Sequence, residues 1–273
     1  MPVTPDDLRA GLSELALGEA TICVHSSLRS FGRVEGGADA VVDAFLAEGC
    51  TLVVPTFAAR IFCLAPPDAM RPERNGIDYA VPHESPGRDR TYTPASNDVS
   101  DSMGAIPAAV LARPERVRGD HPLCSFAAIG PRADIVSEQR PLDVYAPLRI
   151  LAARDGFVLL IGVALDRMTL IHLAEERAGR TLFRRWANGP DGRPIEVETG
   201  GCSDGFGSLE PVLAPLARET LVGESRWRAF PARAALDAAT DAIREQPEIT
   251  RCERDDCPRC ADAIAGGPRY SSS

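Results

Sequence analysis

The chain has 273 residues, and its 30 basic residues are all arginine, against 39 aspartates and glutamates, so the net charge is −9. Without lysine there is no lysine Schiff base and no Walker A lysine, which excludes pyridoxal enzymes, class I aldolases and ordinary P-loop NTPases. Any bound anion must be held by arginine, hydroxyl or backbone N–H groups. The acidic balance argues against nucleic acid as a partner and would attract a cationic small molecule.

The chain start and the hydropathy pattern predict a soluble, cytoplasmic protein. The first residues show no basic stretch followed by an apolar one, as a signal peptide would. No apolar run approaches the roughly 20 residues that cross a bilayer, so we expect no membrane partner. In the cytoplasm, the eight cysteines are expected as reduced thiols or metal ligands rather than disulfides.

The first part of the chain alternates helical and strand patterns. A helix is predicted to begin after Thr4, and a buried strand is predicted over 20–24. The polar loop 25–37 then leads into a helix over 38–47 and a strand over 51–54. This strand–loop–helix–strand unit predicts a parallel α/β sheet. Because ligands bind at the C-terminal ends of such strands, the 25–37 loop is a candidate binding loop.

The rest of the chain contains one long interruption and a distinct end. Residues 58–100 are rich in Pro, Asp, Arg and Asn, and they predict a variable, irregular insertion within a single domain over 1–273. Residues 246–273 are predicted to form a cysteine-containing C-terminal cap. Further helices are expected at 103–112, 169–179, 208–221 and 233–245, and further strands at 122–129, 156–163 and 195–199.

The candidate binding loop carries three hydroxyls and a guanidinium before a pair of glycines. Hydroxyls, arginine and the free N–H groups of a helix N-terminus are all suited to phosphate. The loop matches neither the dinucleotide-binding nor the Walker A spacing. From its chemistry alone it is either an anion site or a plain polar loop. The groups concerned are Ser26, Ser27, Arg29, Ser30 and the Gly36-Gly37 pair.

A second candidate group lies on the helix predicted at 169–179. Three-residue spacing places Thr169, His172 and Glu175 on one helix face. A histidine backed by a carboxylate can act as a general base near neutral pH. The alternative is a surface histidine paired with Glu175 or Glu176. His121 is likewise either a second acid/base or substrate contact, or a structural residue.

The cysteines of the C-terminal cap have partial zinc-site spacing. Cys257 and Cys260 form a C-x-x-C pair, Cys252 adds a third thiol, and Cys202 is a candidate fourth ligand. Because there is no second C-x-x-C pair, the pattern favours reduced thiols over a structural zinc. Cys124 opens a buried strand and is expected to be a packed thiol rather than a nucleophile.

Five blocks of the sequence together resemble the antibiotic N-acetyltransferase family, the aminoglycoside 3-N-acetyltransferases, and they occur in the family's order. The resemblance covers residues 4–182. The blocks are His25-Ser26-Ser27-Leu28-Arg29-Ser30-Phe31-Gly32 with Glu35-Gly36-Gly37; Thr51-Leu52-Val53-Val54-Pro55-Thr56-Phe57; Met103-Gly104-Ala105-Ile106-Pro107; His121-Pro122-Leu123-x-Ser125-Phe126-Ala127-Ala128; and Thr169-x-x-His172-Leu173-Ala174-Glu175.

The resemblance implies a three-layer α/β/α fold with a mainly parallel central sheet. It also implies acetyl-CoA as the donor and direct transfer to an amine without an acyl-enzyme. His172 would be the base, Glu175 would orient the amine or His172, and Thr169 or a backbone N–H would stabilise the oxyanion. His121, Glu175 and Glu176 would contact the substrate. The residues implied to bind CoA are Ser26, Ser27, Leu28, Arg29, Ser30, Phe31, Gly32, Gly36, Gly37, Met103 and Ile106.

The expected function is thus acetyl-CoA-dependent N-acetylation of an aminoglycoside, or of a related amino sugar or amine metabolite, by a monomer or homodimer. Two other classes of function remain. One is a thiol- or zinc-dependent hydrolase that uses Cys23, Cys124 or the terminal cysteines. The other is a non-catalytic family member that binds CoA or a metabolite. Thiol release from acetyl-CoA in the presence of amines separates the three.

Overall fold

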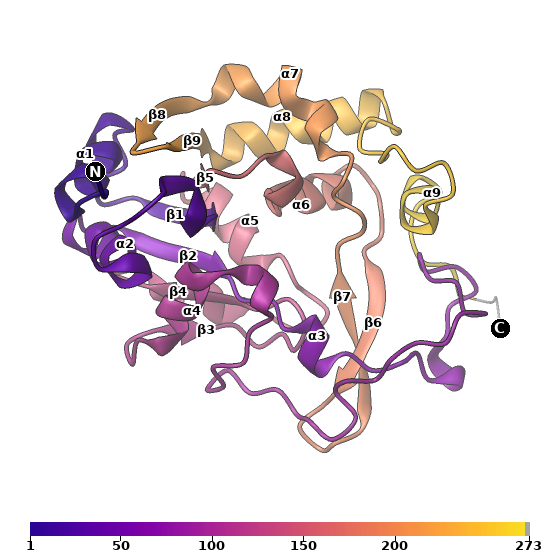
Figure 1. Cartoon of the computed structure of the whole chain (residues 1–273). Helices are drawn as coiled ribbons and strands as arrows, with labels where there is room; N and C mark the ends of the chain where they lie inside the picture. The colour runs from indigo at the N-terminus through magenta and orange to yellow at the C-terminus, as the bar shows by residue number, and fades with distance from the viewer. Residues whose placement is uncertain (271–273) are drawn as a thin grey trace.

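A seven-stranded sheet in the order β3-β4-β2-β1-β5-β9-β8 runs through the computed structural model, which describes residues 1–270 (Figure 1). At its centre β1 (Thr21–Ser26) pairs in parallel with both β2 (Thr51–Pro55) and β5 (Phe157–Ile161). These three strands are short apolar runs buried on both faces, as central parallel strands require.

On both sides of this centre the pairing is antiparallel. β4 (Phe126–Ile129) runs against β2 and β3 (Val117–Arg118), while β9 (Ser225–Pro231) runs against β5 and β8 (Arg218–Val222). The sheet is therefore mixed: β1, β2, β3, β5 and β8 point in one direction, and β4 and β9 run against them. These two strands arrive through a loop or hairpin rather than through a crossover helix, which is why they are antiparallel to their neighbours.

The predicted helix over 208–221 was wrong in its second half. The chain forms a short helix, α7 (Glu210–Leu213), one 3-10 turn, Ala214–Leu216, and then strand β8. Pro215 cannot donate the backbone hydrogen bond that would continue a helix begun at α7. Gly223, with φ at +61°, then turns the chain tightly from β8 into β9.

Alternating side chains along the strands divide the core into two layers, which confirms the α/β/α arrangement. Cys23 and Val158 face one cluster, whereas Ile22, Val24 and Leu159 face the other. On the first side lie α5 (Ala146–Ala153), α6 (Leu170–Arg177) and α8 (Ala232–Glu245); on the second lie α1 (Pro5–Glu14), α2 (Gly37–Ala47) and α4 (Ala105–Ala112).

A two-stranded ribbon, β6 (Phe183–Asn188) with β7 (Pro194–Thr199), extends away from the sheet (Figure 1). The 58–100 segment is largely irregular, as predicted, with only a short helix α3 (Ala59–Phe62) and single turns. It is nevertheless anchored. The buried Asn75 amide exchanges two 2.8 Å hydrogen bonds with the backbone of Arg184 in β6. The insertion thus uses the ribbon as a support.

The last helix within residues 1–270, α9 (Pro258–Ile264), packs beside the insertion: Gly76 N–H donates to the Asp262 carboxylate at 2.6 Å. Across residues 1–270, no helix has both the length and the apolar character needed to cross a membrane.

Candidate active site

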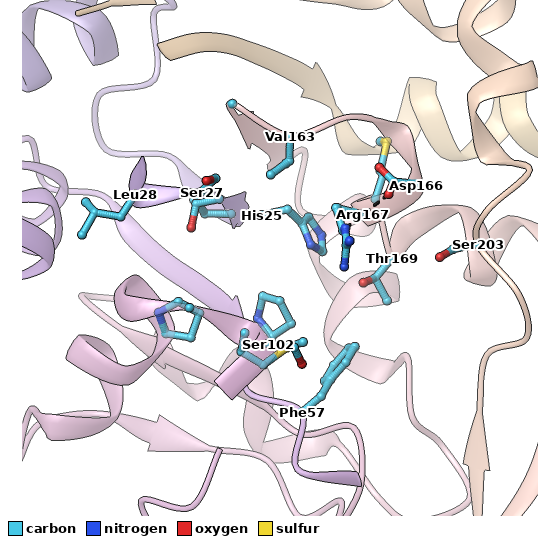
Figure 2. Close-up of a pocket in the computed structure, with 18 of the residues that line it drawn as sticks. His25, Ser27, Leu28, Phe57, Ser102, Val163, Asp166, Arg167, Thr169 and Ser203 are labelled. Carbon is cyan, nitrogen blue, oxygen red and sulfur yellow. Dashed lines mark ion pairs between the residues drawn. The ribbon is translucent and has the colours of Figure 1, made fainter. Parts of the chain in front are cut away.

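A cavity of about 890 Å³ opens at the C-terminal ends of the three parallel strands. This is the position expected from the strand pattern. It is bounded by the end of β1 with the loop after it, by the segment leading into α4, and by the segment between β5 and α6. Figure 2 shows Ser27 and Leu28 at one side of the cavity and Thr169 and Ser203 at the other, with His25 and Arg167 between them.

One end of the cavity is rich in hydroxyls and cations. Ser26, Ser27, Leu28 and Arg29 all line it, and the Arg29 side chain is exposed. Across from them lies the segment that starts α4, where Gly104 precedes the helix with φ at +84°. This helix begins at the cavity and therefore turns free N–H groups towards it.

The structure places other residues of the predicted CoA set behind this surface. Besides the four residues Ser26–Arg29, only Met103 of the predicted CoA set lines the cavity. Ser30 Oγ donates to Ser27 O at 2.7 Å and contacts Ser225 Oγ at the same distance, and Phe31 packs edge-on against Trp227. Through these contacts Ser30 and Phe31 hold the loop after β1 against β9 from the side away from the cavity. Those that lie outside the lining are Ser30, Phe31, Gly32, Gly36, Gly37 and Ile106.

His172 lies at the opposite end, on α6, with only 9% of its surface exposed. Its Nδ1 is 2.8 Å from Glu175 Oε2, so the one-face spacing seen in the sequence is realised as a hydrogen bond. An ionised carboxylate only accepts, so Nδ1 carries the proton and Nε2 keeps its lone pair. Thr169, one turn earlier, also lines the cavity.

A buried chain of polar groups holds Glu175. Its Oε1 accepts hydrogen bonds from Arg180 Nη1 and, at 3.0 Å, from Thr250 Oγ1. Arg180 Nη1 also reaches Thr250 Oγ1 at 2.8 Å. Both carboxylate oxygens are thereby occupied, and Glu175 is absent from the cavity lining. Its position suits orienting His172 rather than touching the amine.

Aromatic side chains and a close glycine pack against the His172 ring and hold its orientation. Tyr145 stacks on one side with ring planes 7° apart, and Phe206 meets it edge-on with centroids 4.8 Å apart. Gly200 lies so near that a Cβ there would come within 2.5 Å of His172 Cδ2 and of the Tyr145 hydroxyl. The ring therefore has one orientation available to it.

The other two buried histidines are not equivalent to His172. His25 lines the cavity, but burial lowers its pKa to about 4, and its Nε2 has only the Cys23 thiol, 3.8 Å away. His121 is fully buried outside the lining. Its Nε2 donates to Glu198 O at 2.9 Å, and its Nδ1 accepts from the Cys124 N–H at 2.9 Å. These two hydrogen bonds are those of the structural alternative considered for His121.

Three further candidates are also placed by the structure. Glu176, beside Glu175, is turned away from the cavity lining and pairs with Arg149 at 3.1 Å. Burial raises the pKa of both the Cys23 and Cys124 thiols to about 12, so neither is a thiolate near neutral pH. A thiol hydrolase using Cys23 or Cys124 therefore has no activated nucleophile.

The four cysteines considered as metal ligands do come together. Cys202, Cys252, Cys257 and Cys260 are all buried, and their sulfur atoms lie within 4.8 Å of one another.

Sequence reasoning missed the residues that support His172 and part of the cavity wall. Arg180, Gly200 and Thr250 match no motif. Gly200 and Thr250 reach the site through the folding of distant segments, whereas Arg180 follows α6 only five residues after Glu175. Asp166 and Arg167 could have been found, because they follow the third parallel strand just as the Ser26–Arg29 loop follows the first.

Comparison with known proteins agrees with this geometry. Residues 23–244 match the family model described as aminoglycoside 3-N-acetyltransferase. The chain belongs to the aminoglycoside 3-N-acetyltransferase family. The enzyme class expected from the resemblance of the sequence blocks is thereby confirmed.

Curated members of the family are similar over much of the chain. Aminoglycoside N(3)-acetyltransferase VII of Streptomyces paromomycinus is 30% identical over 91% of this chain and 77% of its own length. Aminoglycoside N(3)-acetyltransferase VIII of Streptomyces fradiae is 34% identical over 65% of this chain. That match spans 62% of the Streptomyces fradiae enzyme, a little less than two thirds of its length.

Solved structures of the family share the fold over nearly the whole chain. The apoenzyme of the aminoglycoside acetyltransferase AAC(3)-IVa superposes with a TM-score of 0.76 at 26% identity, covering 98% of each chain. YokD from Bacillus subtilis superposes with a TM-score of 0.73 at 26% identity, over 89% of this chain and all of that one.

Proposed function

We propose that this protein transfers the acetyl group of acetyl-CoA to an amine of an aminoglycoside or a closely related amino sugar, with His172 as the general base. The observation that carries this proposal is the position of His172 at the cavity. Its Nδ1 is hydrogen-bonded to the buried Glu175 carboxylate, which leaves Nε2 as the proton acceptor.

Proton transfer is the chemistry that this histidine suits. An aliphatic amine is largely protonated near neutral pH and must lose a proton to attack a thioester. Nε2 of His172 takes that proton, and the neutral nitrogen then adds to the carbonyl carbon. Glu175 stabilises the imidazolium that results, and the buried Arg180 and Thr250 hold Glu175 in place through hydrogen bonds to its Oε1.

The tetrahedral adduct then collapses: the nitrogen gives up its extra proton to solvent, the bond between carbon and sulfur breaks, and the His172 imidazolium protonates the sulfur, so that CoA leaves as a thiol. A hydroxyl near the reacting carbonyl would stabilise the oxyanion. The Thr169 side chain lines the cavity one helical turn from His172 and is our candidate for this donor. We propose direct attack without an acyl-enzyme, since burial keeps the Cys23 and Cys124 thiols neutral and so unsuited to accept the acetyl group.

The other end of the cavity suits the charged part of the donor. Arg29 is exposed there, and Ser26 and Ser27 add hydroxyls next to it; Arg167 is exposed between this end and Thr169. In a chain without lysine, these arginines are the cations available in the cavity lining to a CoA pyrophosphate. The N-terminus of α4 adds backbone donors.

Two observations support a cationic acceptor. The chain carries a net charge of −9, and Asp101 and Asp166 lie in the cavity lining. The similar enzyme AAC(3)-IVa has also been solved in complex with a gentamicin and with apramycin. We therefore propose an aminoglycoside as the acceptor here.

The test follows the release of CoA thiol from acetyl-CoA in the presence of a panel of aminoglycosides and simple amines. We expect release with at least one aminoglycoside, and a fall of about a hundredfold or more in kcat for His172→Asn. The matched control is His83→Asn, an exposed histidine of the insertion, which should keep the wild-type rate.

Full activity in His172→Asn would overturn the assignment of the base. Acetyl-CoA binding without thiol release for any amine would instead favour the non-catalytic role. Calorimetric titration with CoA measures that binding independently of turnover.

A further inference from the structure

We infer that Cys202, Cys252, Cys257 and Cys260 bind one structural zinc ion. The four thiols come from two distant parts of the chain: Cys202 from the loop after β7, and the other three from the C-terminal cap that ends in α9. Nothing in the proposed acetyl transfer uses them. Their convergence thus calls for a separate explanation.

The spacing of the sulfur atoms fits tetrahedral coordination. With Zn–S bonds of about 2.3 Å, the sulfurs of a regular tetrahedron are about 3.8 Å apart. Here Cys252 Sγ and Cys260 Sγ are 3.6 Å apart, and all four sulfurs lie within 4.8 Å of one another. All four cysteines are free, so no disulfide accounts for the cluster.

Ordinary core packing does not explain it either. Within residues 1–270, the cluster contains only these four cysteines, with no aliphatic or aromatic side chain among its members. A tetrahedral set of four thiolates is instead a preferred ligand set of zinc.

Hydrogen bonds towards the sulfurs match what a metal-bound thiolate accepts. The Cys252 N–H points at Cys260 Sγ at 3.4 Å, and Arg254 Nη2 points at Cys257 Sγ at 3.4 Å. Four thiolates around one divalent ion carry a net charge of −2, which the Arg254 guanidinium offsets in part.

The position of the cluster gives the metal a structural role. Cys202 lies two residues after Gly200, which packs against His172, and Cys252 lies two residues after Thr250, which bonds Glu175. A metal bound by both segments would clamp them together beside Glu175. This consequence for catalysis rests on the proposed function, whereas the metal site itself does not.

Metal content tests the site without any activity measurement. The protein is purified under reducing conditions without chelators and analysed by elemental mass spectrometry. We expect about one zinc per chain in the wild type and in the control Cys63→Ser, which removes a thiol outside the cluster. We expect less than about 0.2 zinc per chain in Cys257→Ser, since three thiolates bind zinc far more weakly.

Cobalt replacement gives a second measurement that needs no variant. Growth in cobalt-supplemented medium should yield a protein with the strong visible bands of tetrahedral cobalt and with thiolate-to-cobalt charge-transfer bands. Less than half an equivalent of zinc in the wild type would overturn the proposal, as would iron in its place. So would a cobalt protein without thiolate bands.

Loss of the metal should also lower stability, because a ligand that binds only the folded state shifts unfolding by mass action. We expect the Tm of Cys257→Ser to fall by at least about 5 °C against Cys63→Ser. If acetyl transfer proves absent from the wild type as well, the zinc content and the cobalt spectrum still decide this proposal.

Discussion

At the His172 end of the cavity the polar side chains are buried and bonded to one another, whereas at the Ser26–Arg29 end they are exposed to solvent. His172, Glu175, Arg180 and Thr250 form one connected chain whose members are at most 9% exposed. Arg29, by contrast, extends from a short 3-10 turn after β1.

This difference matches the two tasks of the acetyl transfer that we propose. Moving a proton requires one histidine tautomer and one ring orientation, and both are secured by burial and by packing against Tyr145 and Phe206. Holding a flexible polyanion requires positive charge and hydrogen-bond donors at a surface that admits it. Substitutions at the two ends should therefore change different kinetic constants.

The largest effect among these is expected for Glu175→Gln. The change keeps the shape of the side chain but removes the charge that orients and stabilises protonated His172. We expect kcat to fall by about 10- to 100-fold with little change in the KM for acetyl-CoA. Steady-state kinetics over a pH series measures this, with the exposed Glu245→Gln on α8 as the control. An unchanged kcat would show that His172 acts without Glu175.

A smaller effect of the opposite kind is expected for Arg29→Gln and Arg167→Gln. Each removes one cation facing the donor, so the KM for acetyl-CoA should rise by about fivefold while kcat stays within about twofold. Added salt should narrow the difference from the wild type. Arg33→Gln, an exposed arginine just outside the cavity lining, serves as the matched control. A loss in kcat alone would contradict the division between the two ends.

The smallest change concerns stability rather than rate. Burial lowers the pKa of His25 and of His121 to about 4, below the ordinary value of 6.5, so the unfolded chain binds more protons between these pH values. Stability is then fully present above pH 6.5 and is lost as the pH falls towards 4. Between pH 7 and pH 5, each histidine should reduce the free energy of unfolding by about 2 kcal/mol.

Urea unfolding at the two pH values checks this expectation. On acidification, the free energy of unfolding of His25→Asn should fall by about 2 kcal/mol less than that of the wild type. The exposed His83→Asn should lose as much as the wild type. Equal losses in all three proteins would show that His25 is not held neutral by burial.

Local patterns predicted the central part of the fold and both ends of the cavity. Short apolar runs predicted the strands β1, β2 and β5, and apolar residues at helical spacing predicted the helices α2, α6 and α8. The spacing of His172 and Glu175 was enough to place them on one helix face, because helix geometry is local. Of the outer strands of the sheet, β4 was predicted, within the strand expected over 122–129, but β3, β8 and β9 were not. β8 was predicted as helix, because its assignment depends on pairing with β9.

The sequence by itself thus determined which chemistry is available: no lysine anywhere, a hydroxyl- and arginine-bearing loop after the first strand, and a histidine with a carboxylate one turn away. Only the tertiary structure decided which of these groups face a common cavity. It also brought Thr250 to Glu175 and Cys202 to the other three cysteines, across 75 residues in the first case. Such long-range contacts follow from the packing of whole layers, which no local pattern encodes.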